Sequence, residues 1–452
     1  MKKLLRNTPL FPALTYLRYA AHRYLAGRHI RSCYLAEGYA LELVDQGICF
    51  FGYYNISPEN RAGDLLFLKV NGQAHHAGEE SRTGQTSQTG EESRNSQTSR
   101  TGETPRAGET PRTGETPRAG ATDAAVITLK SSAGDIKELG RSRAWNWQQG
   151  CMLQWLGNGQ GHILYNDYDA AEDRYVSRVI DTEGGHIQTY GMPVNNVDKK
   201  GRFALCLNYD RLARMRPDYG YFQKKNTSLT QDREDGIWHM DLGSGEIRLI
   251  LSLEDLKNLS PASTMKGAAH KVNHIDINPS GTRFMFLHRW VGPQGRFMRL
   301  VTANPDGSEP AILHGDDMIS HCCWLGDAEI LSFCDYNGVQ GYFRFKDRSD
   351  EVKPWTGFMP ALDGHPSISP DGEWLVTDTY PGLSRMSALY LVNLPRKTVL
   401  CAGRFHQPLR YMKEMRVDLH PKWSPDGQSI YFESAHSGVR QLYRLRLTQS
   451  AR

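Results

Sequence analysis

The sequence predicts an all-β fold, a single seven-bladed β-propeller, on three observations. A polar lead-in, a turn of the Ser-Pro-Asp-Gly type and a short β-rich run recur seven times along the chain. Stretches that alternate apolar and polar residues follow several copies, as the outer strands of a four-stranded blade would. The chain has 452 residues, of which 39% are hydrophobic, so it is long enough to bury the core of one large all-β domain.

The first forty residues are predicted to form a separate amphipathic segment, followed by the propeller over residues 41–452. Between residues 10 and 30, Leu, Ala and Tyr recur at roughly helical spacing with arginines between them, which predicts a short N-terminal helix. Such a helix either packs against the propeller or contacts an anionic membrane surface peripherally. Basic residues interrupt every apolar run, so the sequence predicts neither an export signal nor a transmembrane segment.

Residues 76–122 are predicted to be a disordered insert within the first blade. They consist mainly of Gly, Ser, Thr, Glu and Arg and include the near-perfect repeat TGETPRAGETPRTGETPRAG. This composition buries too little apolar surface to offset the entropy of ordering the chain. We therefore expect a loop between strands with no part in catalysis.

Each copy of the repeat has the composition of a two-strand hairpin. Alternating residues lead into a turn such as Pro-Asp-Gly, and Phe, Leu, Ile or Val then occupy every second position. Seven such units close radially into blades that leave no long open sheet edge. The copies begin at Gly52, Gly150, Pro193, Asn273, Ser320, Gly364 and Leu419.

One position, at the entry to the innermost strand of each copy, carries histidine in four consecutive blades. In chain order this position reads Tyr53, Met152, Val194, His274, His321, His365 and His420. Equivalent inner-strand residues converge on the axis of a propeller, so we expect the four imidazoles on one side of the central channel. Such a set suits a divalent metal such as Zn²⁺ or Mn²⁺, with Cys322 or Cys323 nearby. The alternative is that each histidine hydrogen-bonds the next blade and serves only the fold.

Arg289 is a candidate anion-binding residue. It ends the hairpin that His274 begins. A guanidinium there could clamp a carboxylate in bidentate fashion. The alternative is a cation stacked on Trp290 at the surface.

A loop rich in arginine and tyrosine follows the third copy. Residues 208–221 contain three arginines and three tyrosines, among them Arg216, Tyr219 and Tyr221. Arginine pairs with carboxylates and tyrosine stacks on sugar rings, so the loop suits an anionic, sugar-like ligand. The alternative is a solvated surface loop.

Tyr53 takes the ring position of the histidines, either as a functional phenol or as a buried aromatic.

Composition and missing motifs exclude several classes of function. The net charge of +4 is too small to indicate a nucleic-acid partner. Eight cysteines without a CxxC indicate a reducing compartment, for which we expect the cytoplasm. The sequence contains no P-loop, no HExxH and no GxSxG motif, and it leaves no room for an appended hydrolase domain, which argues against a prolyl-oligopeptidase type of peptidase.

At these residues the sequence resembles the seven-bladed propeller polysaccharide lyases, namely the ulvan lyases and, more distantly, oligogalacturonate lyase. The resemblance covers nearly the whole chain outside the helix and the insert. It rests on the motifs at 51–54, 149–155, 165–167, 208–221 and 274–290 and on the two His-Pro blades at His365 and His420.

The resemblance implies β-elimination at a uronic acid of an acidic oligo- or polysaccharide. A metal or an arginine neutralises the carboxylate and so acidifies the C5 proton, a His or Tyr removes that proton, and a Tyr or His protonates the departing O4. Carried onto this chain, it implies a metal site at the four ring histidines and a carboxylate clamp at Arg289 or Arg216. The acid or base would then be Tyr53, Tyr219 or Tyr221.

The chain also departs from the lyase pattern. Such lyases use histidines from early blades, where this sequence has Met152 and Val194 at the ring position and only His162 and His186 nearby. The base of the family therefore has no clear counterpart. Two hypotheses follow: a metal-containing lyase, or a non-catalytic propeller that binds a glycan or protein partner, as in polysaccharide assembly, with structural histidines.

Overall fold

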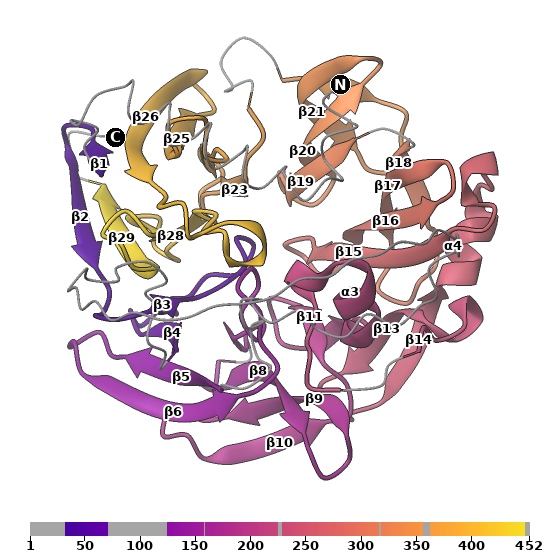
Figure 1. Ribbon diagram of the computed structural model, residues 1–452, viewed down its shortest axis with the longest axis horizontal. Helices are drawn as coiled ribbons and strands as arrows, with labels where there is room; N and C mark the ends of the chain where they lie inside the picture. Colours follow the sequence, from indigo (N-terminus) through magenta and orange to yellow (C-terminus); the bar gives the residue numbers. More distant parts are fainter. Residues whose placement is uncertain are drawn as a thin grey trace, which may run out of the picture.

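A computed structural model describes residues 32–70, 124–157, 159–224, 228–315, 318–355 and 362–447. Within these ranges the chain forms seven antiparallel sheets that stand radially around a central axis (Figure 1). Apart from two N-terminal strands, the strands of each sheet are neighbours in sequence order. The predicted seven-bladed β-propeller is confirmed.

The first four blades each contain four consecutive strands. Blade 1 contains β3 (Cys49–Phe50), β4 (Leu65–Lys69), β5 (Ala125–Lys130) and β6 (Ile136–Ser142). Blade 2 contains β7 (Gln154–Trp155), β8 (Ile163–Asp169), β9 (Arg174–Ile180) and β10 (His186–Tyr190). Blade 3 contains β11 (Val194–Val197), β12 (Phe203–Cys206), β13 (Gly236–Asp241) and β14 (Ile247–Ser252). Blade 4 contains β15 (Ala269–Ile277), β16 (Phe284–Gly292), β17 (Gly295–Ala303) and β18 (Ala311–Gly315).

The last three blades follow the same plan, and short helices lie in the connections. Blade 5 contains β19 (Ile319–Trp324), β20 (Glu329–Tyr336), β21 (Val339–Lys346) and β22 (Val352–Pro354). Blade 6 contains β23 (Ser367–Ile368), β24 (Trp374–Asp378), β25 (Met386–Asn393) and β26 (Thr398–His406), and blade 7 contains β27 (Lys422–Trp423), β28 (Ser429–Ser434) and β29 (Gln441–Leu447). The helical segments are α3 (Tyr209–Met215), η1 (Pro217–Tyr219), η2 (Asp232–Glu234), α4 (Leu253–Leu259), η3 (Ser263–Met265) and η4 (Lys413–Met415).

Six of the seven repeat copies supply the two innermost strands of their blades, as predicted, whereas the first copy, from Gly52, supplies only β4 because β3 ends at Phe50. Their turns end in glycines such as Gly281, Gly372 and Gly427, whose φ angles of +73°, +75° and +68° are rarely adopted by other residues. The second strands are apolar because both faces of a blade are covered by neighbouring blades. In β4, for example, residues 66–68 are all fully buried.

The N-terminal strands join the two ends of the chain. β1 (Cys33–Leu35) pairs with β26 and β2 (Tyr39–Leu43) pairs with β29, so the outermost strand of blade 7 comes from the beginning of the chain. The blade strands therefore start at Cys33, before residue 41, where the sequence places the start of the propeller. The helix expected within residues 10–30 and the insert at 76–122 lie outside the described residues.

A buried ion pair fastens blade 7 to blade 1. Glu433 on β28 accepts hydrogen bonds from the backbone N–H groups of Phe51 and Gly52, at 3.2 and 2.8 Å. Its other oxygen accepts from Nε of Arg440 at 3.0 Å, and both side chains are at most 1% exposed. The same contacts fix the start of the loop that carries Tyr53.

No helix among the described residues is long and apolar enough to cross a membrane.

Candidate functional site

The structure brings the four ring histidines together as a half-ring on one side of the axis. His274, His321, His365 and His420 follow one another, with ring centroids separated by 5.4, 3.9 and 4.3 Å. All four side chains are buried, and none is more than 8% exposed. His274 lies in a bulge of β15 with φ of +57°, and His420 has φ of +45°, so the backbone turns as it presents both rings.

Two tyrosines of blade 1 lie against the half-ring. The hydroxyl of Tyr53 contacts Nδ1 of His274, and its ring centroid is 5.6 Å from that of His420. The hydroxyl of Tyr54 donates to the carbonyl of Cys322 at 2.8 Å, and its ring lies 5.3 Å from that of His365. Blade 1 therefore extends the half-ring with phenol groups, as the ring position of Tyr53 predicted.

Asp378 on β24 orients two of the histidines. Its carboxylate accepts from Nδ1 of His365 at 2.8 Å and from the backbone N–H groups of His365 and His420, at 2.7 and 3.2 Å. Burial lowers the pKa of His365, but the charge and hydrogen bond of Asp378 outweigh burial, so the pKa is raised. Because Nδ1 donates to Asp378, Nε2 is the ring nitrogen left to face a metal.

Two of these histidines and one aspartate have the composition of a metal site. His365, His420 and Asp418 each offer a ligand atom, and the three atoms lie within 4.8 Å of one another. Two imidazoles and a carboxylate suit Zn²⁺ or Mn²⁺, and the contact of His365 with Asp378 is the type that orients metal-bound histidines. Burial lowers the pKa of His420 well below its usual value, with help from the charges of His365 and Lys422, so the ring is neutral at neutral pH and one of its nitrogens offers a lone pair.

Unpartnered polar atoms gather at the same place. Within the described part of the chain, no hydrogen bond is made by Nε2 of His365, by either ring nitrogen of His420 or by Oδ1 of Asp418 and Asp363. The hydroxyl of Tyr219 is also unpartnered. A buried polar atom without a partner costs about 1–3 kcal/mol, so several in one place indicate that a ligand satisfies them. The donor atoms therefore fit a bound metal.

His321 lies beside these three residues in a different setting. Its Nδ1 is 3.1 Å from Oγ of Ser320, and that hydroxyl donates to Asp363 at 2.6 Å. Burial lowers the pKa of His321 well below its usual value, assisted by His365 and Arg216. His321 is thus a neutral imidazole next to the metal candidates.

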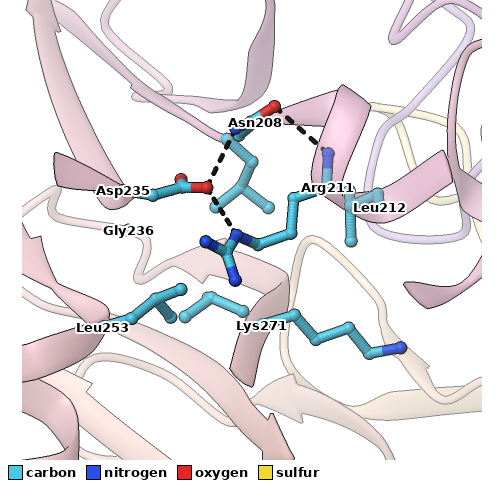
Figure 2. A pocket seen from close by; sticks show the side chains of 9 residues that line it. Asn208, Arg211, Leu212, Asp235, Gly236, Leu253 and Lys271 are labelled. Carbon is cyan, nitrogen blue, oxygen red and sulfur yellow. Dashed lines mark hydrogen bonds and ion pairs between the residues drawn. The ribbon is translucent and has the colours of Figure 1, made fainter. Parts of the chain in front are cut away.

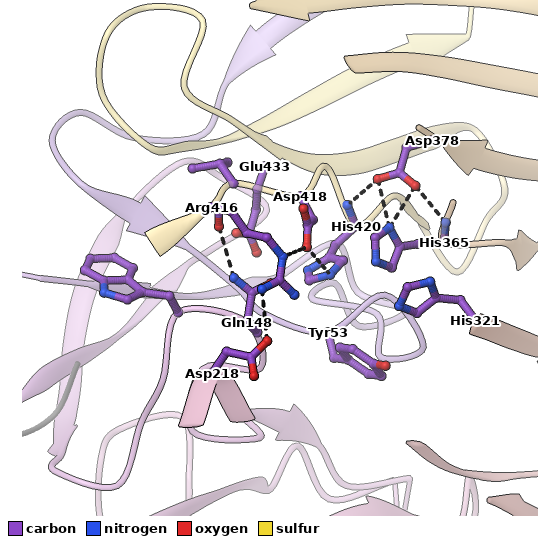
Figure 3. A network of polar contacts seen from close by, with 12 residues as sticks. Tyr53, Gln148, Asp218, His321, His365, Asp378, Arg416, Asp418, His420 and Glu433 are labelled. Atoms are coloured by element: carbon purple, nitrogen blue, oxygen red, sulfur yellow. Dashed lines mark hydrogen bonds and ion pairs between the residues drawn. The ribbon is translucent and has the colours of Figure 1, made fainter. Parts of the chain in front are cut away.

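Arginines and aspartates lie beside the half-ring, and Figure 3 shows Arg416 in contact with Asp218 and Asp418 there. Arg416 donates to Asp218 at 2.9 Å and to Asp418 at 2.7 Å, and Arg216 lies 3.4 Å from Asp218. The side chains of Arg216 and Arg416 are 23% and 21% exposed, whereas the half-ring is buried. These arginines are the more exposed part of the site, and we call Arg216 and Arg416, together with Asp218 that contacts both, the cationic rim.

Two further cations lie deeper, on blade 4. Lys271 on β15 and Arg289 on β16 form no ion pair among the described residues, and Nε of Arg289 has no hydrogen-bond partner there. Burial, and then the charge of Arg216, lower the pKa of Arg289 to about 9 and that of Lys271 to about 7. An anion bound beside these two side chains would supply the missing counter-charge.

The predicted tyrosines separate into two places. The ring of Tyr219 packs with those of Tyr53 and Tyr54, and the guanidinium of Arg216 lies 4.3 Å from its centroid. Burial is the main cause of the raised pKa of Tyr219, so its phenol is protonated at neutral pH. Tyr221 instead stacks on Tyr209 at 4.1 Å, and its contacts are away from the half-ring.

The cysteines near the half-ring do not resemble ligands. Sγ of Cys322 donates to Oγ of Ser332 at 3.2 Å. Burial raises the pKa of Cys322 to about 12 and that of Cys323 well above its usual value, so both thiols are protonated. Met152 and Val194, at the ring position of the early blades, are buried apolar side chains.

Sequence reasoning missed several residues of the site. Asp418 had a usable signal, because the last two blades share an Asp-x-His-Pro pattern that includes Asp363 and Asp418 two residues before a ring histidine. Asp378, Arg416 and Lys271 had none, since their roles depend on contacts between strands.

Comparisons with known proteins bear mainly on the fold. No family model matches the chain. Over 155 residues the chain is 25% identical to the Tol-Pal system protein TolB of Francisella tularensis, a match that spans 32% of this chain and 35% of that protein. The crystal structure of an oligogalacturonate lyase from Vibrio parahaemolyticus superposes with a TM-score of 0.55 and 13% identity, covering 91% of this chain and 94% of that one. An oligogalacturonate lyase in complex with manganese gives a TM-score of 0.41 at 13% identity, over 76% of this chain and 98% of that one.

Proposed function

We propose that the chain is a lyase that cleaves uronate-containing oligosaccharides or polysaccharides by β-elimination. The observation that carries the proposal is that unpartnered imidazole and carboxylate atoms lie close together near Arg289, which forms no ion pair among the described residues and whose charge, after burial, helps to lower the pKa of His274 and His321. Cations without counter-ions suit an acidic ligand. The similarity in fold to a protein described as an oligogalacturonate lyase supports the same class of substrate.

His365, His420 and Asp418 would hold a divalent ion such as Zn²⁺ or Mn²⁺. When bound, such an ion withdraws charge from a substrate carboxylate and so acidifies the proton on the adjacent carbon. Asp378 keeps Nε2 of His365 aimed at the site by accepting from Nδ1.

Arg289 and Arg216 would orient the carboxylate, and tyrosine would complete the elimination. The unpartnered Nε of Arg289 is a free donor for a carboxylate oxygen. Tyr219, whose raised pKa keeps its unpartnered phenol protonated, would give its proton to the departing O4. Tyr53 contacts His274 and would position the sugar against the half-ring.

A second candidate is a non-catalytic propeller that binds a glycan or a protein partner. The observation that favours it is the burial of the half-ring, whose four histidines are at most 8% exposed. In that case the histidines, and any metal they hold, would stabilise the centre of the fold.

One experiment tests both candidates. The metal content of the purified protein is measured by mass spectrometry, and ultraviolet absorbance of a 4,5-unsaturated uronate is followed over a panel of acidic oligo- and polysaccharides. Asp418→Asn and Asp363→Asn form a matched pair, because each lies two residues before a ring histidine but only Asp418 belongs to the metal candidates. We expect Asp418→Asn to lower metal content and turnover at least tenfold and Asp363→Asn to retain the metal.

The outcomes separate the candidates. Metal with new absorbance supports the lyase. Metal without turnover on any acidic glycan contradicts the lyase and supports the binding propeller. Absence of metal in protein prepared with Zn²⁺ and Mn²⁺ contradicts the metal site.

The compartment is part of the same proposal. None of the eight cysteines, all of which lie in the described ranges, forms a disulfide, which supports a reducing environment such as the cytoplasm.

A further inference from the structure

Lys271 and Arg289 are direct neighbours across β15 and β16. Their Cα atoms are partners in the antiparallel ladder, so both side chains leave the same face of blade 4. Lys271 is 5% exposed, and its amine donates to the carbonyl of Met215, at the end of α3, at 2.8 Å. In Figure 2 the amine points away from the Arg211–Asp235 ion pair that lies beside its stem. Lys271 therefore reaches toward the loop that follows α3.

The surroundings of Lys271 hold more positive than negative charge. The charged groups that face it are Arg216, Arg289 and Arg296, which are cations, and Asp218, which already pairs with two arginines. A buried amine in such a setting gives up its proton more easily than one in water. Burial, followed by Arg216 and Arg289, thus brings the pKa of Lys271 to about 7, and a large share of the molecules carry a neutral amine at neutral pH.

We propose that Lys271 is the general base of the elimination and takes the proton from the carbon beside a carboxylate that Arg289 holds. This inference rests on the proposed function. As Nζ of Lys271 binds the proton, the C5–H bond breaks and its electron pair forms the C4–C5 double bond. The C4–O4 bond breaks, and O4 takes the proton of the Tyr219 phenol. Lys271 and Tyr219 then recover their starting states by exchanging a proton through solvent.

The arrangement on blade 4 supplies what this step needs. Abstraction of a proton next to a carboxylate requires a cation at the carboxylate and a lone pair beside it. Arg289 has the free donor and remains protonated, whereas Lys271 keeps one lone pair when its neutral amine donates to Met215. The step also needs an acid, and the raised pKa of Tyr219 keeps that group protonated while the pKa of Lys271 is lowered.

Most ring nitrogens of the four half-ring histidines already have another role or partner. Nδ1 of His274 contacts the hydroxyl of Tyr53, and His365 and His420 are the metal candidates. His321 is engaged with Ser320. Lys271 is therefore a buried group with a lowered pKa, beside the unpartnered Nε of Arg289, that the metal site does not use.

Variants of Lys271 test the inference in the metal-loaded, full-length protein. Lys271→Met removes the amine, and Lys271→Arg keeps a positive charge without a usable base. We expect kcat to fall about 10²–10⁴-fold in both, with KM changed much less in Lys271→Arg. The limb of the kcat/KM profile near pH 7 should be present in the wild type and absent from Lys271→Arg. Lys257→Met, which removes a lysine paired with Asp232 at 3.0 Å, serves as the control.

Two further measurements guard against a folding defect. Metal content identical to that of the wild type shows that the funnel is intact, and Lys271→Cys treated with bromoethylamine should regain activity because an amine returns to the same place. The pH dependence of acetylation of Lys271, read by mass spectrometry, should titrate near pH 7 in the wild type without any substrate. Titration above about pH 9 overturns the inference.

The possible failures are distinguishable. A wild type that turns over no acidic glycan overturns the proposed function and this inference with it. A wild type that is active while Lys271→Met retains kcat, or while Lys271→Arg keeps the limb near pH 7, overturns the role of Lys271 alone.

Discussion

Glu433→Gln should destabilise the propeller strongly, because it removes the charge that neutralises a buried arginine. Arg440 is 1% exposed and donates to Glu433 through Nε at 3.0 Å and through a second guanidinium N–H. Hydrogen bonds to a charged group contribute about 1.5–3 kcal/mol each, and breaking a buried ion pair from one side costs about 3–5 kcal/mol. Glutamine can still accept from the backbone of Gly52, so the loss is expected to come from the charge. We therefore expect about 3–5 kcal/mol of lost stability.

A nearby lysine adds to the cost. Lys422 donates to the carbonyl of Gly52 at 2.9 Å, and burial lowers its pKa to about 8 although the charge of Glu433 raises it. Without Glu433, both Lys422 and Arg440 would be buried cations without a counter-ion. Lys422 then deprotonates, whereas Arg440 cannot.

The assay is equilibrium unfolding in urea at pH 7, followed by tryptophan fluorescence. Arg440 lies over the rings of Phe50 and Trp147, at 4.9 and 5.4 Å, so the emission reports on this region. Glu433→Gln, Arg440→Met and the double variant are compared. Contacting partners couple by about 0.5–3 kcal/mol, so the double variant should lose less than the sum of the two single losses. A loss below 1 kcal/mol for Glu433→Gln, or strictly additive losses, would refute the reasoning.

Three further predictions follow from single contacts. Asp378→Asn should lower the affinity for Zn²⁺ or Mn²⁺ about 10–100-fold in a chelator competition, because the carboxylate that orients His365 is lost; unchanged affinity would contradict its role. Burial lowers the pKa of His270 to about 4, so this side chain binds a proton more readily in the unfolded chain. The free energy of unfolding should therefore fall by up to about 3 kcal/mol as the pH drops from about 6.5 to 4. His270→Asn should flatten this part of the profile of stability against pH, and an equally steep profile would contradict the prediction. Gly52→Ala should lower the thermal unfolding midpoint and reduce turnover, since φ at residue 52 is +126° and a Cβ would lie 2.6 Å from the carbonyl of Gln149, a cost of more than about 1 kcal/mol; a wild-type midpoint would contradict it.

The blades could be predicted from the sequence because the pattern that marks each of them lies within a short stretch of the chain. Each turn glycine, such as Gly281 or Gly372, specifies a positive φ between two strands that are adjacent in the chain, and seven repetitions leave few other folds. Ring closure was not predictable in the same way. The strands at Cys33–Leu35 and Tyr39–Leu43 are short, and their partners lie about 400 residues away in β26 and β29.

The same distinction applies to the site. Aligning the repeats placed His274, His321, His365 and His420 at one position because a repeat conserves register from blade to blade. The groups that determine their chemistry lie at positions that the alignment of the ring residues did not single out. Asp378 faces His365 from the next strand, and the pKa of Lys271 is lowered by burial and then by the charges of Arg216 and Arg289, which lie on other elements.

The hydrogen bonds that close the propeller between blade 7 and blade 1 and those of the candidate site belong to one network. Arg416 connects the two parts. Its carbonyl accepts from Gln148, on the loop before blade 2, at 3.0 Å and from Arg440 on blade 7 at 3.3 Å. Its guanidinium binds Asp218 and Asp418, on the cationic rim and at the metal candidates. A substitution that weakens the contacts between blade 7 and blade 1 is therefore expected to shift the backbone that positions the side chain of Arg416. For this reason a variant of the closure network can impair metal binding without touching a ligand, and metal content is the measurement that separates this effect from a direct loss of the site.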